Sequence, residues 1–157
     1  MKNIFKLMAL FAFVLCFSSC DDDEDTALPT LPVTAANLNG VWQLAEWNGQ
    51  PLAEDTYCYI KFNRKELTFE MYQKFDSMYA RYITGSFKIK NDPYLGYVLS
   101  GDYDFGNGEW NHDYIVTDLV ESGSMVWTAK DDDSDVSKYV RCDKVPDEII
   151  AEVKVDE

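Results

Sequence analysis

The feature that most restricts the fold is a two-residue alternation of apolar and polar side chains between Gly40 and Cys142. Side chains of a β-strand point alternately to its two faces, so this period indicates strands with one buried face. Turn sequences interrupt the alternation about every ten residues, and the pairs Asn48-Gly49 and Gly106-Asn107 are typical of them. We therefore expect eight strands: one beginning at Gly40, and others over 57–62, 67–71, 78–89, 94–105, 110–120, 125–128 and 136–142.

Eight alternating strands are enough to close an antiparallel sheet on itself. Such a cylinder has an interior just wide enough for side chains or one small ligand. The expected fold is therefore all-β, a single eight-stranded antiparallel up-and-down β-barrel over residues 37–145. Aromatic residues are 15% of the chain, so rings can build much of the core. Residues 146–157 form a polar C-terminal tail, and its first residues, from Pro146, are compatible with a short helix.

The N-terminus has the layout of a secretory signal peptide over residues 1–19. Lys2 and Lys6 precede an apolar run at 7–17, and small residues follow it. The run is too short to cross a bilayer as a permanent helix. Residues 20–36 then predict an extended tether, because five acidic residues at 21–25 stay solvated and Pro29 and Pro32 follow them.

Residues 17–20, Phe-Ser-Ser-Cys, resemble the lipobox of bacterial lipoproteins, although Phe17 stands where leucine is commoner. The resemblance implies that Cys20 becomes the lipidated N-terminal residue and anchors the protein to a membrane. The acidic run after it resembles the export signal of Bacteroidetes-type surface lipoproteins. Together they imply an outer-membrane lipoprotein of a Gram-negative bacterium, exposed on the cell surface. An ordinary cleaved leader followed by a hydrated spacer is the alternative.

Charge limits the partners of the mature protein. Removing the two lysines of the leader leaves 12 basic and 28 acidic residues, a net charge of −16. Such a surface repels phosphate backbones and anionic headgroups, so we expect no nucleic-acid partner. Cations and cationic protein patches remain compatible with it, and we expect a monomer.

The cysteines leave one pair for a disulfide. Cys16 departs with the leader and Cys20 is the expected anchor, so Cys58 and Cys142 remain in a chain that folds where disulfides persist. Their bond would close a loop of about 85 residues and contribute about 4 kcal/mol. Two free thiols on neighbouring strands are the alternative.

Three features of the strand region resemble the lipocalin-like proteins of the calycin group. Gly40-Val41-Trp42 matches the G-x-W of their first strand, and Arg141 stands where the family has a basic residue that packs over that tryptophan. Cys142 lies where many members bridge the C-terminal part to the barrel. A partial match to a further loop motif lies at 116–119. The resemblance covers about residues 38–144 and implies that Trp42 and Arg141 are structural, closing the narrow end of the barrel.

The sequence offers little for catalysis or metal binding. His112 is the only histidine, and no neighbouring spacing supplies it with metal co-ligands or a catalytic partner. Asp131, Asp133 and Asp135 alternate as in a calcium loop, but the glycine and glutamate that such a loop needs are absent. No nucleophile elbow, P-loop or dinucleotide fingerprint occurs. We expect neither an enzyme nor a cofactor or metal.

The open end of the barrel remains as a site. Its expected lining is aromatic and can present hydroxyl and indole N–H groups to a ligand. One hypothesis is a surface-anchored module that binds a small, partly apolar molecule or a sugar there. The other is an accessory or inhibitory lipoprotein that contacts another protein, with side chains filling the barrel. The residues predicted to line the mouth are Tyr72, Tyr82, Trp110, Tyr114 and Trp127.

Overall fold

The computed structural model describes residues 28–75, 77–106 and 108–155. The predicted signal peptide, the acidic run and the predicted lipid anchor at Cys20 lie outside the described residues. Within the described ranges, no helix combines the length and apolar character needed to cross a membrane.

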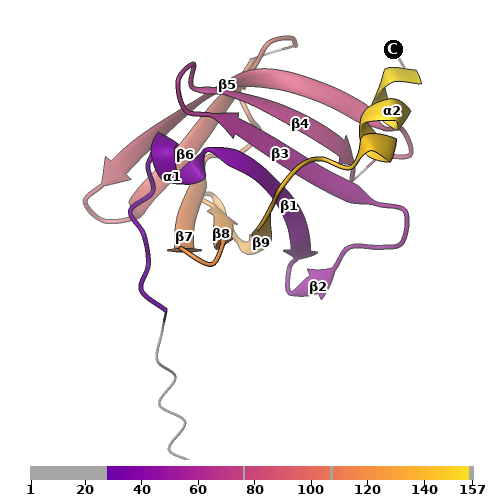
Figure 1. The fold of residues 1–157 in the computed structure, drawn as a ribbon. Helices are drawn as coiled ribbons and strands as arrows, with labels where there is room; N and C mark the ends of the chain where they lie inside the picture. Colours follow the sequence, from indigo (N-terminus) through magenta and orange to yellow (C-terminus); the bar gives the residue numbers. More distant parts are fainter. Residues whose placement is uncertain (1–27, 76, 107, 156–157) are drawn as a thin grey trace, which may run out of the picture.

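The described strands form one antiparallel sheet, in the order β2-β1-β3-β4-β5-β6-β7-β8-β9. Because β9 also pairs with β1, the sheet closes into a barrel (Figure 1). The two-residue β2 pairs antiparallel with the last residues of β1. The predicted eight-stranded up-and-down barrel is therefore confirmed for the described residues. The strands are β1 (Gly40–Trp47), β2 (Gln50–Pro51), β3 (Tyr57–Asn63), β4 (Thr68–Lys74), β5 (Arg81–Asp92), β6 (Gly96–Tyr103), β7 (Tyr114–Val120), β8 (Ser124–Ala129) and β9 (Asp132–Cys142).

The apolar alternation determines which side chains face the interior. Trp42 pairs with Ile60, and Ile60 pairs with Met71 on the next strand, and all three are buried. Their neighbours along each strand point outward. The inward aromatic and aliphatic side chains therefore form one continuous core within the barrel.

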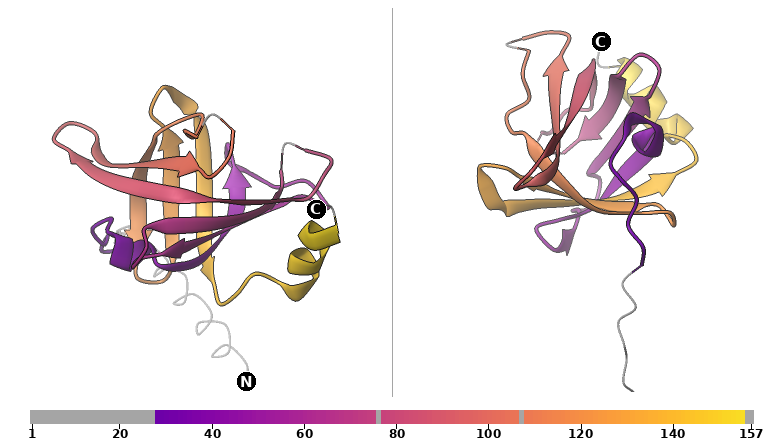
Figure 2. Two further views of the ribbon diagram at one scale, coloured as in Figure 1. Left: turned by 90° about the horizontal axis from the view of Figure 1, so that it is seen from above. Right: turned by 90° about the vertical axis from the view of Figure 1, so that its left-hand side faces the viewer.

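The connections divide between two ends of the barrel. The β1–β3, β4–β5, β6–β7 and β8–β9 connections lie at one end, here called the open end. The β3–β4, β5–β6 and β7–β8 turns lie at the other, the closed end, with the short helix α1 (Ala35–Leu38). The long β5–β6 hairpin reaches past its neighbours at the closed end (Figure 2).

The last residues of the expected tether are packed on the barrel. Thr30 forms a bridge with Val120, and Leu31 N–H donates to the carbonyl of Leu119 at 2.7 Å. Val33 is only 3% exposed. The folded unit therefore begins before the predicted boundary at residue 37, because these apolar side chains cover the closed end.

The predicted C-terminal tail contains helix α2 (Asp147–Val155), which packs on the outer face of the barrel (Figure 1). Ile149 and Val153 are four positions apart and buried, as on one face of a helix. Glu152 accepts hydrogen bonds from Lys74 Nζ at 2.8 Å and from Tyr57 Oη at 3.0 Å. These contacts hold α2 to β3 and β4.

Some strand boundaries differ from the prediction. Asn48 and Gly49 form the expected tight turn, with φ of 51° and 73°. The second predicted hairpin turn, at 106–108, is present, since Asp102 and Glu109 on its two sides form an antiparallel bridge and Trp110 N–H donates to the carbonyl oxygen of Gly101 at 2.8 Å. The strand predicted to follow it begins later, because β7 starts only at Tyr114. The predicted loop at 131–135 largely belongs to β9, because a short turn suffices between β8 and β9.

The predicted disulfide between Cys58 and Cys142 is wrong for this structure, in which neither cysteine belongs to a disulfide. Cys58 faces the barrel interior beside Met71, whereas Cys142 packs with the outer cluster beside Val41. A disulfide requires Cβ atoms about 3.5–4.5 Å apart, and side chains on opposite faces of a sheet cannot meet in this way. The alternative placed the two cysteines on neighbouring strands, but β1 lies between β3, which carries Cys58, and β9, which carries Cys142.

Candidate binding site

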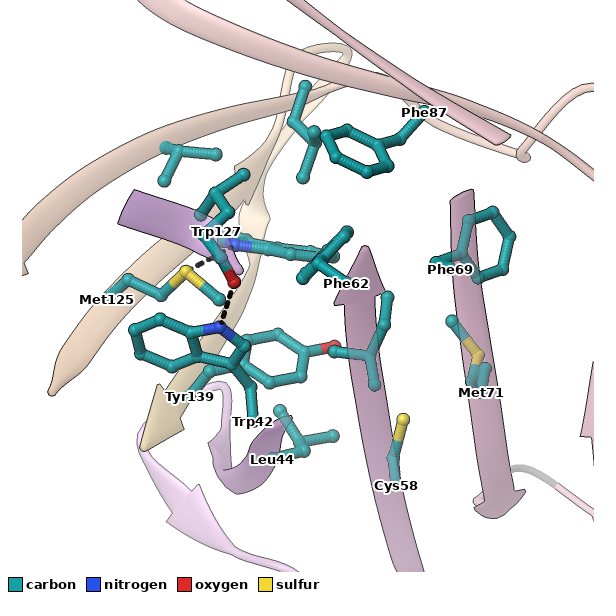
Figure 3. Packing of buried hydrophobic residues seen from close by; sticks show 14 of the residues in the cluster. Trp42, Leu44, Cys58, Phe62, Phe69, Met71, Phe87, Met125, Trp127 and Tyr139 are labelled. Atoms are coloured by element: carbon teal, nitrogen blue, oxygen red, sulfur yellow. Dashed lines mark hydrogen bonds between the residues drawn. The ribbon is translucent and has the colours of Figure 1, made fainter. Parts of the chain in front are cut away.

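A tryptophan seals the closed end of the barrel. Trp42 is fully buried, and its Nε1–H donates to the carbonyl oxygen of Leu38 at 2.8 Å. Figure 3 shows its indole beside Met125 and Tyr139, with the bond to Leu38 drawn as a dashed line. The carbonyl comes from the last residue of α1, so the segment before β1 is tied to the plug.

Arg141 covers this plug from outside. Its guanidinium carbon lies 4.1 Å from the centroid of the Trp42 ring, a geometry that contributes about 0.5–1 kcal/mol at exposed sites. Its two terminal nitrogens donate to the carbonyl oxygens of Asn39 and Asn37, each at 2.7 Å. The guanidinium therefore links the end of β9 to the chain that enters β1.

Gly40 leaves room for that guanidinium. Its φ of +117° is unfavourable for residues with a side chain, and a Cβ there would lie 2.8 Å from a terminal nitrogen of Arg141. The glycine of the G-x-W motif thus allows the cation to lie close to the backbone above Trp42.

A cavity of about 660 Å³ opens at the other end of the barrel. Its volume lies within the range of about 300–1,000 Å³ that is usual for small-molecule sites. The floor is apolar, while polar groups lie nearer the rim. The lining residues are Leu44, Trp47, Cys58, Met71, Gln73, Phe75, Arg81, Ile83, Tyr103, Phe105, Gly106, Glu109, Trp110, Asn111, His112, Tyr114, Trp127, Asp135, Ser137 and Tyr139.

Aromatic rings in mutual contact form one wall of this cavity. The rings of Trp110 and Trp127 are nearly parallel, with centroids 5.9 Å apart. Tyr114 packs against both, at 6.0 Å and 5.3 Å, and Tyr139 lies 4.5 Å from Trp127. Rings that pack on one another hold each other in fixed orientations, so this wall of the cavity has a defined shape.

Three of the five predicted mouth residues, Trp110, Tyr114 and Trp127, line the cavity together. The placement of Tyr72 and Tyr82 there is wrong, because their rings pack against each other at 5.0 Å on the outer face, in the cluster that α2 covers. The two-residue alternation of side chains along β4 and β5 explains why both tyrosines lie outside the barrel.

Phe69 and Met71 face inward, so Tyr72, the residue directly after Met71, must face outward. Tyr82 precedes the inward Ile83 and takes the outer face for the same reason. On that face Tyr72 Oη donates to Glu70 Oε2 at 2.9 Å. Burial, and then this hydrogen bond, raise the pKa of Tyr72 well above its usual value.

The sequence interpretation missed several lining residues that the same alternation could have found. Met71 shares a face with the expected core residue Phe69, and Ser137 shares one with Tyr139 on β9. Gln73 continues the inward face of β4 to the rim. By contrast, no local pattern places Phe75 and Phe105 at the mouth, because they belong to connections whose course depends on the closed barrel.

Two side-chain contacts join different elements at the rim of the cavity. Trp47 Nε1–H donates to Asp135 Oδ1 at 2.8 Å, joining the end of β1 to β9. His112 Nδ1 lies 2.6 Å from Asp131 Oδ1, joining the β6–β7 and β8–β9 connections. The Asp131 carboxylate raises the pKa of His112 above its usual value. His112 thus has a structural contact at the rim.

Polar atoms also occur deeper in the cavity. Ser137 is buried, and its hydroxyl belongs to the lining. Burial, followed by the charge of Asp135, raises the pKa of Tyr114 to about 12, so its hydroxyl stays protonated at neutral pH. Among the described residues, Trp110 Nε1 is the one buried side-chain polar atom without a hydrogen-bond partner. A buried donor without a partner is costly, and native proteins contain few of them.

The described residues contain no group of three or more histidine, cysteine and acidic side chains placed to hold a metal ion. Asp131, Asp132 and Asp133 are exposed at the β8–β9 turn. Asp131 pairs with His112, and Asp132 accepts from the hydroxyl of Ser134 at 2.6 Å.

Comparison with known proteins agrees with this architecture. The family model described as a lipocalin-like domain matches residues 38–127, from the end of α1 to Trp127 in β8. A comparison with curated protein sequences finds no match. The match spans more than half of the chain and includes both the G-x-W motif and most of the cavity wall. The chain therefore belongs to the lipocalin-like domain family.

Proposed function

We propose that this protein is a binding module that takes up a small, partly apolar molecule in the open end of its barrel, without catalysing a reaction. A lipocalin-like barrel generally suggests ligand binding. The observation that carries the proposal here is the cavity of about 660 Å³ with an aromatic wall. One end of the barrel is sealed by Trp42 and Arg141, so a ligand enters and leaves at the other end.

The lining favours a ligand with an apolar body and few polar groups. Buried carbon surface from Leu44, Met71 and Ile83 lines the same cavity and removes apolar ligand surface from water. Each Å² of such surface contributes about 25 cal/mol. Gln73 and Ser137 offer hydrogen bonds that can orient the ligand. A sugar stacked on the rings is the other ligand class that this lining accommodates.

The cavity favours this function over a purely protein-binding role. A protein-binding barrel needs no interior space, and its rings could pack to fill the core. Here Trp110, Tyr114 and Trp127 instead border a cavity that reaches the surface. A catalytic role would need a nucleophile or base beside an activating partner. The His112–Asp131 pair instead joins two connections at the rim.

We also propose that Cys20 carries a lipid that anchors the protein to the outer membrane, with the barrel at the cell surface. The support is the resemblance of residues 17–20 to a lipobox and the acidic run that follows. Mass spectrometry of the protein purified from membranes tests this proposal. The expected mature N-terminus is a lipidated Cys20, and an unmodified N-terminus at another position contradicts it.

Blocking the cavity tests the binding function. In the purified full chain, Ser137→Phe adds a ring to the buried lining, and we expect it to weaken the binding of the neutral apolar dye Nile red by about tenfold or more, equivalent to 1.4 kcal/mol. Dye fluorescence during titration measures the affinity. The reason is steric, because the added ring takes the volume that the dye would fill.

Thr128→Phe is the matched control. Thr128 follows Trp127 on β8 and points to the outer face, so the same ring is added outside the barrel. This variant should bind the dye as the unmodified protein does. Equal dye affinity in Ser137→Phe, with an unchanged circular dichroism spectrum, would overturn the cavity as the binding site.

A further inference from the structure

The charges around the open end are unevenly distributed. The mouth, here residues 48–56, 77–81, 104–106, 108–113 and 130–135, holds nine carboxylates and two permanent cations, Arg81 and Lys130. Lys130 lies 3.9 Å from Asp113, and His112 is paired with Asp131. The mouth of the cavity is therefore strongly negative.

Two of these carboxylates belong to the cavity lining itself. Glu109 is exposed on the β6–β7 connection, and Asp135 is half-buried on β9. Arg81 is the permanent cation among the described lining residues. It is exposed, and one of its nitrogens donates to the carbonyl oxygen of Phe75 at 3.5 Å. The carboxylates thus outnumber the cation at the entrance.

Inside this negative entrance the cavity is aromatic. The faces of Trp110 and Trp127, with Tyr114 beside them, carry negative electrostatic potential and attract cations. The field of the mouth reaches these rings, since the charge of Asp135 is the second cause, after burial, of the raised pKa of Tyr114. The rings and the carboxylates therefore both favour a positively charged ligand.

We propose that the ligand of this cavity is an organic monocation, an amine or quaternary ammonium compound with an apolar or aromatic body. Its body lies against Trp110, Tyr114 and Trp127, while its charge lies near Glu109 and Asp135. Attraction by the negative mouth also speeds the entry of cations and repels anions. This inference rests on the proposed binding function and adds the charge of the ligand to it.

Three probes of the same shape and different charge test the inference. They are 4-phenylbutylamine, 4-phenylbutanol and 4-phenylbutyrate, titrated into the purified full chain at about 10 mM salt, where screening is weak. Calorimetry and tryptophan fluorescence measure the affinities. We expect the amine to bind about tenfold more tightly than the alcohol, and the carboxylate to bind most weakly.

Charge removal at two places supplies matched variants. Glu109→Gln with Asp135→Asn neutralises the lining carboxylates, and the amide at 135 still accepts the hydrogen bond from Trp47. Glu121→Gln with Asp143→Asn removes the same charge from exposed residues near the closed end. The first pair should weaken amine binding about fivefold to tenfold and leave alcohol binding unchanged, and the second should change neither.

The outcomes separate the two proposals. Alcohol or carboxylate binding as tight as amine binding, or an amine affinity that both double variants leave unchanged, overturns the cation inference while the binding function stands. If none of the three probes binds, and Nile red does not bind either, the binding function itself fails and the charge preference falls with it. Loss of the amine preference at about 0.15 M salt would further support attraction by the mouth.

Discussion

Trp42→Ala is expected to reduce the free energy of unfolding by about 3–5 kcal/mol, the usual cost of removing a large buried ring. Trp42 is fully buried at the closed end, and its loss leaves a void beneath Arg141. It also removes the donor that satisfies the carbonyl of Leu38. Urea unfolding followed by circular dichroism measures the change.

Two controls separate the plug from a general effect of losing an indole. Trp42→Phe keeps a ring under the guanidinium but lacks the N–H, so we expect a smaller loss. Trp47→Ala removes a tryptophan that is 44% exposed, and its cost should be about 1–2 kcal/mol, mainly from the lost hydrogen bond to Asp135. If Trp42→Ala cost no more than Trp47→Ala, the indole would not be the structural plug of the barrel.

Gly85→Ala is expected to destabilise the protein by about 2–3 kcal/mol through overpacking. Gly85 lies on the inner face of β5, where an added Cβ would overlap the carbonyl oxygen of Asp102 on β6 and the ring of Phe69. The ring could tilt, but the carbonyl belongs to the neighbouring strand and can move only with the sheet. The thermal midpoint and the urea midpoint should both fall.

Ser86→Ala provides the comparison for Gly85→Ala. Ser86 is the next residue on β5 and faces away from the interior, so its substitution should change stability by no more than about 0.5 kcal/mol. Trp110 also packs on Phe69, at 5.2 Å, so a displaced Phe69 ring would disturb the cavity wall. A Gly85→Ala variant as stable as Ser86→Ala would show that β5 and β6 separate at this point without cost.

The fold was predictable because its main signal is local. Alternation assigns each side chain to a face without reference to the rest of the chain, and the number of strands then favours closure. The same rule, applied consistently, would have placed Tyr72 and Tyr82 outside the barrel, since Phe69 and Met71 are inside. Their predicted place at the mouth is wrong because an aromatic residue type does not indicate which face of a strand its side chain occupies.

The cysteine prediction failed for a different reason. Counting cysteines shows which pairs are available, but the bond depends on the faces that both residues occupy. Cys58 lies two residues before Ile60 on β3, so both side chains face the interior. Arg141 lies over the buried Trp42, so the next residue, Cys142, takes the outer face of β9. The terminal segments were underestimated because their packing depends on contacts with distant strands.

The sequence by itself determined the closed antiparallel barrel, because strand period acts over a few residues. The packing of Arg141 over Trp42 was implied by the resemblance to the lipocalin-like family, not by any local pattern. Only the tertiary structure decided that Trp110, Tyr114, Trp127 and Tyr139 meet around one cavity. Those rings come from β7, β8, β9 and a connection, and their distances depend on the register of the closed sheet and on loops at its open end. The volume left between them is a property of packing, which no local pattern contains.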